Sequence, residues 1–229
     1  MTLEVCCGNL ESVHAAVQGG ARRIELCSSL ELDGLTPPME DLRAARAAFP
    51  DLTIHVLIRP RAGNFCYSET EINQMEKEIG SALEECADGI VTGCLTPEGN
   101  VDVAATERLV RTAKERNART RITFHRAFDR CRDPFAALEQ IVRLGCDRIL
   151  TSGGKPTAED GIPELRALQE QAEGRIIILP GGGVTPLNAA KILSATGCRE
   201  IHASASCSMD GKKVTSTEKV AEILQEICG

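Results

Sequence analysis

Apolar and polar residues alternate along this chain in a repeating order. Short β-rich apolar runs occur at residues 3–7, 22–27, 53–59, 89–92, 120–125, 147–152, 175–180 and 199–204, and each has the length of an ordinary strand. Between them, apolar residues recur at helical spacing, as at Ile72, Met75 and Ile79. A last helix is expected at about 217–227. The pattern predicts eight successive strand–helix units.

Several helix starts can be read from capping residues. Ser68 and Glu71 have the order of a capping box. Asp133 and Thr185 each precede a proline, and proline suits the first turn of a helix. We therefore expect helices to begin at these three places.

The number of units decides between two folds. Strands that alternate with helices form a parallel sheet, and eight units in 229 residues match the size of a TIM (β/α)8 barrel. An open doubly wound sheet is the alternative, but the first strand–helix turn, Cys7-Gly8-Asn9, lacks its G-x-G-x-x-G phosphate fingerprint. No linker divides the chain. We expect a single barrel domain over residues 1–229.

Composition narrows the classes of partner. A net charge of -7 and a pI near 5.3 argue against a nucleic-acid partner. No apolar run reaches the roughly 20 residues that span a bilayer, and the first residues do not resemble a signal peptide. The 11 cysteines are odd in number and form no C-x-x-C pair, which favours free thiols in a reducing compartment. We expect a cytoplasmic protein that contacts no membrane.

Alternation along each strand assigns its two faces. In the first strand, Leu3 and Val5 share one face, while Glu4 and Cys6 share the other. The same reasoning places a mixed set inside the barrel, and its mouth members are Cys6, Glu25, Cys27, Arg59, His125 and His202. Buried charges are costly unless they are paired. These residues therefore form either a functional site at the C-terminal mouth of the strands or an internal Glu–Arg–His ion-pair network.

Three loops are candidates for binding an anion. Arg59 and Arg61 follow the third strand, and guanidinium groups suit a carboxylate or phosphate. The run Gly181-Gly182-Gly183 offers backbone amides beside a helix start, in a place where barrels often bind phosphate. Ser152-Gly153 is a similar, weaker candidate. Local ion pairs and simple tight turns are the alternative interpretations.

Two kinds of chemistry suit the mouth. Cys6 and Cys27 end adjacent strands with the same inward parity, and neighbouring strands lie about 4.8 Å apart. Two such thiolates suit Cu(I), although two packed cysteines would use the same geometry. Glu25 and His125 would instead support proton transfer in an isomerase or lyase. No lysine occupies an inward strand position, which disfavours Schiff-base catalysis.

Motifs in order along residues 3–206 resemble those of the CutC copper-homeostasis family. They include Arg-Pro-Arg at 59–61, Phe-His-Arg-Ala-Phe-Asp at 124–129, Ser152-Gly153, the glycine run at 181–183 and His-x-Ser-Ala at 202–205. The resemblance implies a TIM-like barrel, a cytoplasmic homodimer or higher homo-oligomer, and Cu(I) bound at Cys6 and Cys27. It also adds Arg126 to the anion-binding candidates.

Two functions therefore remain open. The first is a copper-homeostasis protein that binds Cu(I) through thiolates. The second is an enzyme on a small anionic or phosphorylated carbohydrate-like substrate, with Glu25, His125, Asp129 and His202 as catalytic candidates. The chain also departs from the family pattern, because Ser206 stands where the family has arginine and the following segment is short. The contribution of that segment to the site is left open.

Overall fold

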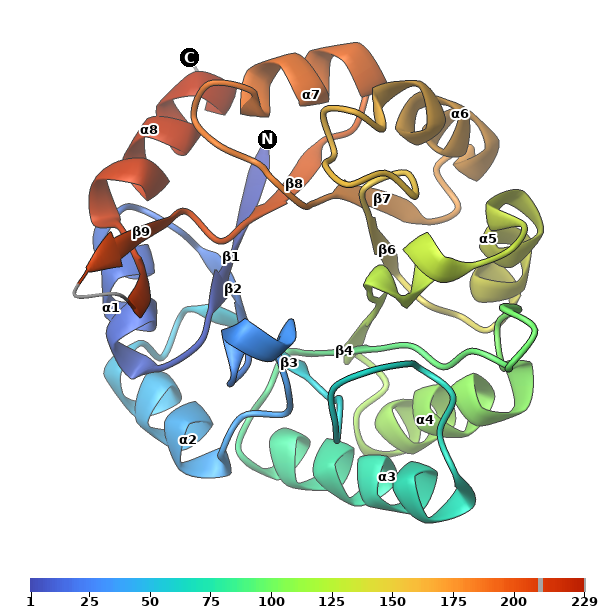
Figure 1. Ribbon diagram of the computed structural model, residues 1–229. Coiled ribbons are helices and arrows are strands. Elements are labelled where there is room, and N and C mark those ends of the chain that lie inside the picture. Colours follow the sequence, from blue (N-terminus) through green and yellow to red (C-terminus); the bar gives the residue numbers. More distant parts are fainter. Residues whose placement is uncertain (210–211, 229) are drawn as a thin grey trace.

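Eight parallel strands form a barrel at the centre of the computed structural model, which describes residues 1–209 and 212–228 (Figure 1). The strands are β1 (Thr2–Cys7), β2 (Arg23–Leu26), β3 (Thr53–Leu57), β4 (Gly89–Thr92), β5 (Arg121–Phe124), β6 (Arg148–Thr151), β7 (Ile177–Pro180) and β8 (Glu200–Ala203). Their order in the sheet is β7-β6-β5-β4-β3-β2-β1-β8, and a parallel bridge between Gly181 and His202 brings its two edges together. The predicted TIM barrel is confirmed.

Helices surround the strands in an outer ring (Figure 1). They are α1 (Leu10–Gln18), α2 (Met39–Ala48), α3 (Glu69–Glu84), α4 (Val103–Arg116), α5 (Pro134–Arg143), α6 (Ile162–Ala172), α7 (Ala189–Thr196) and α8 (Thr217–Cys228), with short 3-10 helices η1 (Leu30–Leu32) and η2 (Arg126–Arg130). Within the described residues, none of these helices has the length and apolar character needed to cross a membrane.

Two of the three predicted helix starts are confirmed. Ser68 and Glu71 form a reciprocal capping box at the start of α3, and the Asp133 side chain accepts two backbone N–H bonds at the start of α5. The prediction at Thr185 was wrong, because α7 begins at Ala189. There the Asn188 side chain accepts from the Thr185 N–H at 2.8 Å and so holds an extra turn ahead of the helix.

The alternation of the strands separates two buried regions. Aliphatic residues such as Val5, Ile24 and Ile54 belong to the main core, to which strands and helices both contribute. Cys27, Leu57 and Val91 form a second, smaller cluster, with Cys6 and Leu30 packed against it. These residues come from β1, β3 and β4 and from the loop that follows β2. Each strand from β1 to β3 pairs in parallel with the next, and this register places the inward side chains in layers. The predicted inward face thus carries both apolar and polar layers.

A β-hairpin follows β8 and was not predicted from the sequence. It consists of β9 (Ser206–Met209) and β10 (Lys212–Thr215), which pair antiparallel, with Ser206 opposite Thr215. The Ser204 and Ser206 hydroxyls lie 3.2 Å apart. The short segment after the eighth strand is therefore a structural element that begins at the residue where the family pattern is broken.

Candidate functional site

A fully buried carboxylate, Glu4 on β1, lies at the centre of an ion-pair layer inside the barrel. Its Oε2 atom lies 2.8 Å from Arg23 Nε and 2.8 Å from His55 Nδ1, and its Oε1 atom lies 3.0 Å from His202 Nδ1. Burial alone would raise the pKa of Glu4, but hydrogen bonds with the two histidines and the Arg23 charge hold that pKa well below its usual range. Glu4 is therefore ionised and paired with three basic side chains.

The same layer contains residues that the sequence analysis did not include among its site candidates. Arg23 also donates to Glu200 at 2.5 Å, and Arg148 donates to the same carboxylate at 2.8 Å. Arg23 could have been included, because it lies two residues before Glu25 on the same strand and therefore faces the same way. The ion-pair network considered as an alternative is thus present in this layer, where it balances buried charge.

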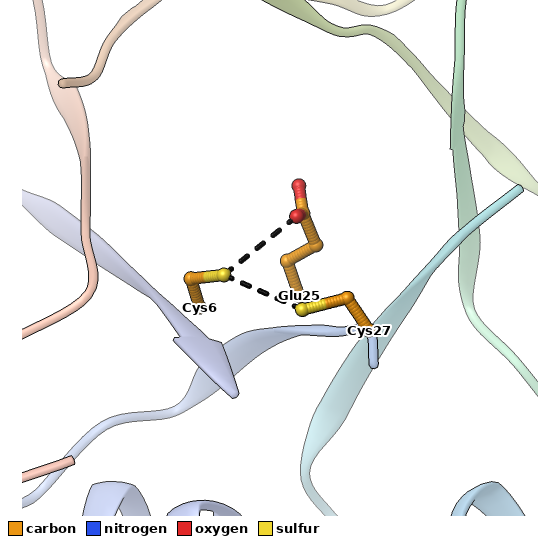
Figure 2. Close-up of side chains that lie close together, drawn as sticks. All are labelled: Cys6, Glu25 and Cys27. Carbon is orange, nitrogen blue, oxygen red and sulfur yellow. Dashed lines mark hydrogen bonds between the residues drawn. The ribbon is translucent and has the colours of Figure 1, made fainter. Parts of the chain in front are cut away.

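Next to this layer, the two predicted metal ligands approach each other closely. Cys6 Sγ lies 3.6 Å from Cys27 Sγ and 3.9 Å from an oxygen of Glu25. Figure 2 shows both contacts as dashed lines. The register places Cys6 directly opposite Glu25, and Cys27 follows two residues later on the same face of the chain. Cys27 is fully buried, whereas Cys6 is partly exposed. The three ligand atoms form a group compact enough to hold one metal ion.

The environment of these groups keeps their protons in place. The hydrogen bond with Cys27 and burial raise the pKa of Cys6 well above its ordinary value. Burial raises the pKa of Glu25 to about 7, although nearby His202 opposes the effect. Burial would lower the pKa of His202, but interactions with Cys6 and Glu4 raise it well above its ordinary value. A metal ion bound by the cysteines must therefore displace protons.

Glu25 joins two groups of ligand atoms. Besides Cys6 and Cys27, it lies close to Glu4 and His202, and the ligand atoms of that second group lie within 4.8 Å of one another. Its Oε2 atom is buried and has no hydrogen-bond partner in the described part of the chain. Glu4 pairs with three basic side chains, whereas Glu25 is a buried carboxyl group that forms no ion pair within the described residues.

His125 follows β5 and is held as a neutral imidazole. Its Nδ1 atom accepts a hydrogen bond from the Ala127 N–H at 3.2 Å, so Nε2 carries the proton. Burial and the Arg59 charge lower the pKa of His125 to about 3. Nε2 is buried without a partner among the residues described. His125 is therefore arranged to donate a hydrogen bond rather than to accept a proton.

The two arginines after β3 bond to groups of the protein itself. Arg59 is buried, and its Nη1 atom donates to the Leu32 carbonyl at 2.9 Å and the Gly34 carbonyl at 2.8 Å. Arg61 pairs with Glu71 at 2.5 Å. The Arg59 bonds tie the loops after β2 and β3 together. The pair of Arg61 with Glu71 corresponds to the interpretation in which these arginines pair with local acids.

A carboxylate of the protein itself binds the amides after β6. Asp129 accepts from the Ser152 N–H at 3.0 Å, the Gly154 N–H at 3.1 Å and the Thr151 hydroxyl at 2.5 Å. Arg126 donates to Asp129 at 2.8 Å and to the Ser152 hydroxyl at 2.9 Å. Asp129 thus fills the place that an external anion would take beside Ser152.

The glycine run after β7 packs close to its neighbours. A side-chain carbon at Gly181 would lie 2.5 Å from a methyl group of Leu150, and one at Gly182 would lie 3.2 Å from Arg126. Gly182 and Gly183 also have positive φ angles, of 104° and 69°, which favour glycine. The structure therefore brings Gly182, Arg126 and Ser152 together. The bonds of Arg59 and Arg61 are made elsewhere, in the loops after β2 and β3 and with α3.

A pocket of about 110 Å³ opens beside Cys6. It is lined by Cys6, Leu30, Ser204, Ser206, Val214 and Thr215. Both strands of the unpredicted hairpin contribute to its wall, so the segment after β8 borders the approach to Cys6. Its volume is large enough for several water molecules.

Known proteins resemble this chain along most of its length. The model of the CutC family matches residues 1–207. A CutC family protein of Bacteroides thetaiotaomicron is 47% identical, covering 95% of this chain and 86% of that protein. One of Vibrio vulnificus is 48% identical, covering 88% of this chain and 80% of that protein.

Solved structures agree with both the family and the fold. A CutC structure from Streptococcus agalactiae superposes with a TM-score of 0.84 at 33% identity, covering 89% of this chain and 98% of that one. A thiamine phosphate pyrophosphorylase from Pyrococcus furiosus superposes with a TM-score of 0.61 at 20% identity, covering 100% of this chain and 97% of that one, and shares the barrel fold. The chain belongs to the CutC family.

Proposed function

We propose that this protein binds Cu(I) through Cys6 and Cys27 and takes part in copper homeostasis in the cytoplasm. The observation that carries the proposal is the 3.6 Å separation of the two sulfur atoms at the ends of adjacent strands. Paired thiolates are soft ligands, and Cu(I) is the soft ion that they select. The name of the Streptococcus agalactiae relative connects that protein with copper homeostasis.

The state of the cysteines supports a reducing location. All eleven are free thiols, including those that lie close together, and free thiols persist where glutathione keeps them reduced. By family resemblance we also expect a homodimer or higher homo-oligomer, which light scattering of the purified protein measures.

A competition experiment tests the copper site. Reduced protein is titrated against a chromophoric Cu(I) chelator without oxygen, and we expect about one Cu(I) bound per chain. The double variant Cys6→Ser/Cys27→Ser loses this ion. The matched control is Cys86→Ser/Cys228→Ser, because both of those thiols are exposed and lie on other elements. Equal Cu(I) uptake by the two double variants would refute the proposal.

A second candidate function follows from groups that a two-cysteine site does not use. Glu25 Oε2 and His125 Nε2 are both buried without partners in the described residues. In an isomerase or lyase acting on a small anionic or phosphorylated substrate, Glu25 would transfer a proton while neutral His125 donates a hydrogen bond to a substrate oxygen. A panel of anionic sugars and sugar phosphates tests this function, since a true ligand raises the melting temperature. The absence of any shift would contradict it.

A further inference from the structure

The ligand chemistry next to the two thiols is mixed rather than purely soft. Glu25 contributes a carboxyl oxygen 3.9 Å from Cys6 Sγ, inside the same compact group of ligand atoms as Cys27. Carboxylates are hard ligands that Cu(I) does not favour. Zinc, in contrast, is bound in proteins by both thiolates and carboxylates.

The spacing of the donor atoms fits a bent arrangement around one ion. With metal–sulfur bonds of about 2.3 Å, tetrahedral geometry places two sulfurs about 3.8 Å apart, whereas a linear arrangement needs about 4.6 Å. The observed Sγ–Sγ distance is 3.6 Å. A tetrahedral ion with one oxygen ligand places sulfur and oxygen about 3.6 Å apart, close to the observed 3.9 Å. The three atoms are therefore nearly preplaced for a tetrahedral ion.

A separate observation indicates that Glu25 is kept for a ligand. Its side chain is only 5% exposed, yet its Oε2 atom has no hydrogen-bond partner within the described ranges. Buried polar atoms are normally satisfied, so each exception calls for a partner. Glu4 Oε2 also lacks a hydrogen bond of good geometry, but it lies 2.8 Å from the basic nitrogens of Arg23 and His55, whereas Glu25 forms no ion pair in the part of the chain described.

We propose that Cys6, Cys27 and Glu25 form a three-ligand site for a borderline divalent cation of the Zn²⁺ type. The pocket beside Cys6 supplies water for the fourth position, as in zinc sites with three protein ligands. The inference shares both cysteines with the proposed copper site and rests on it for the two thiolates. It differs from the copper proposal because Glu25 is also a ligand. The Glu25 carboxylate then makes the site prefer a divalent ion over Cu(I).

Variants of the full, reduced chain separate the two ions. Zn²⁺ affinity is measured by competition with a chromophoric chelator, and Cu(I) affinity as described above. We expect Glu25→Gln to weaken Zn²⁺ binding by roughly tenfold or more, the scale of losses around metal sites, while Cu(I) affinity changes less than about threefold. The control is Glu226→Gln, which removes an exposed carboxylate on α8.

X-ray absorption of the Zn²⁺-loaded wild-type protein tests the ligand set without relying on any variant to fold. We expect two sulfurs at about 2.3 Å together with lighter oxygen or nitrogen ligands at about 2.0 Å. A shell of sulfur alone, a shell without sulfur, or equal Zn²⁺ affinity in wild type and Glu25→Gln would overturn the inference. If the protein binds Cu(I) but not Zn²⁺, this inference fails and the copper proposal stands. If the wild-type protein binds Zn²⁺ but not Cu(I), the copper proposal is refuted instead.

Discussion

Replacing Glu25 with glutamine changes how the stability of the metal-free protein depends on pH. Burial raises the pKa of this carboxyl group from 4.5 to about 7. Between these values the native protein holds a proton that the unfolded chain has lost, so stability falls as the pH rises through this window. The favourable contribution is fully present below about pH 4.5 and is lost above about pH 7.

The size of the effect follows from the width of the window. One pKa unit corresponds to about 1.4 kcal/mol, so the free energy of unfolding of the wild-type protein falls by about 3 kcal/mol through this group alone. Glutamine does not titrate. The free energy of unfolding of Glu25→Gln, relative to wild type, should therefore rise by about 3 kcal/mol between pH 4.5 and pH 8. A domain of this size gains roughly 2–4 °C in melting temperature per kcal/mol.

Urea denaturation of both proteins in steps of one pH unit measures this difference, with reductant and a metal chelator present throughout. Titrating groups that do not interact with Glu25 occur in both proteins and cancel in the comparison. Glu226→Gln serves as control, because that exposed carboxylate lies far from the barrel interior on α8. A stability difference between Glu25→Gln and wild type that stays constant with pH would refute the reasoning.

Three further predictions concern the neighbouring groups. Glu4→Gln leaves Arg23 and two histidines facing a neutral amide, so urea denaturation should show a loss of about 3–5 kcal/mol; a loss below about 1 kcal/mol would contradict the buried network. His125 should remain neutral from pH 5 to 8 in imidazole ¹⁵N NMR spectra, because burial lowers its pKa to about 3; a midpoint near 6.5 would show that the site is open to solvent. Asp129→Asn should cost about 1–3 kcal/mol and accelerate amide hydrogen exchange at Ser152 and Gly154, and unchanged exchange would contradict its role in that loop.

The barrel could be predicted because the spacing of hydrophobic residues differs between strands and helices, and because the strand–helix order is repeated eight times. Each predicted strand range overlaps an observed strand, and a one-residue shift in register would turn an entire inward set toward the helices. Parity therefore placed Cys6, Glu25 and Cys27 on one face before any distance was known. Their contact follows from register, which places Cys6 opposite Glu25.

The loops could not be predicted in the same way, because their partners lie in other loops. Nothing in the sequence around Arg59 shows that its guanidinium group bonds to the carbonyls of Leu32 and Gly34. Asp129, in the segment after β5, likewise bonds to Ser152 in the loop after the adjacent strand β6, a separation of 23 residues along the chain. The hairpin of β9 and β10 was missed because its strands, Ser-Cys-Ser-Met and Lys-Lys-Val-Thr, contain few of the β-branched and aromatic residues that indicate a strand.

The difference between Glu4 and Glu25 distinguishes a structural carboxyl group from a functional one inside this barrel. Both are buried inward carboxyl groups on neighbouring strands, and both would be costly without partners. Glu4 is ionised and surrounded by Arg23, His55 and His202, which leaves it little capacity for an outside ligand. Glu25 has no such cation pairing and lies against two thiols. A fold that gives one buried carboxylate three basic partners and its neighbour none loses stability at Glu25, and such departures from local consistency are expected at functional sites.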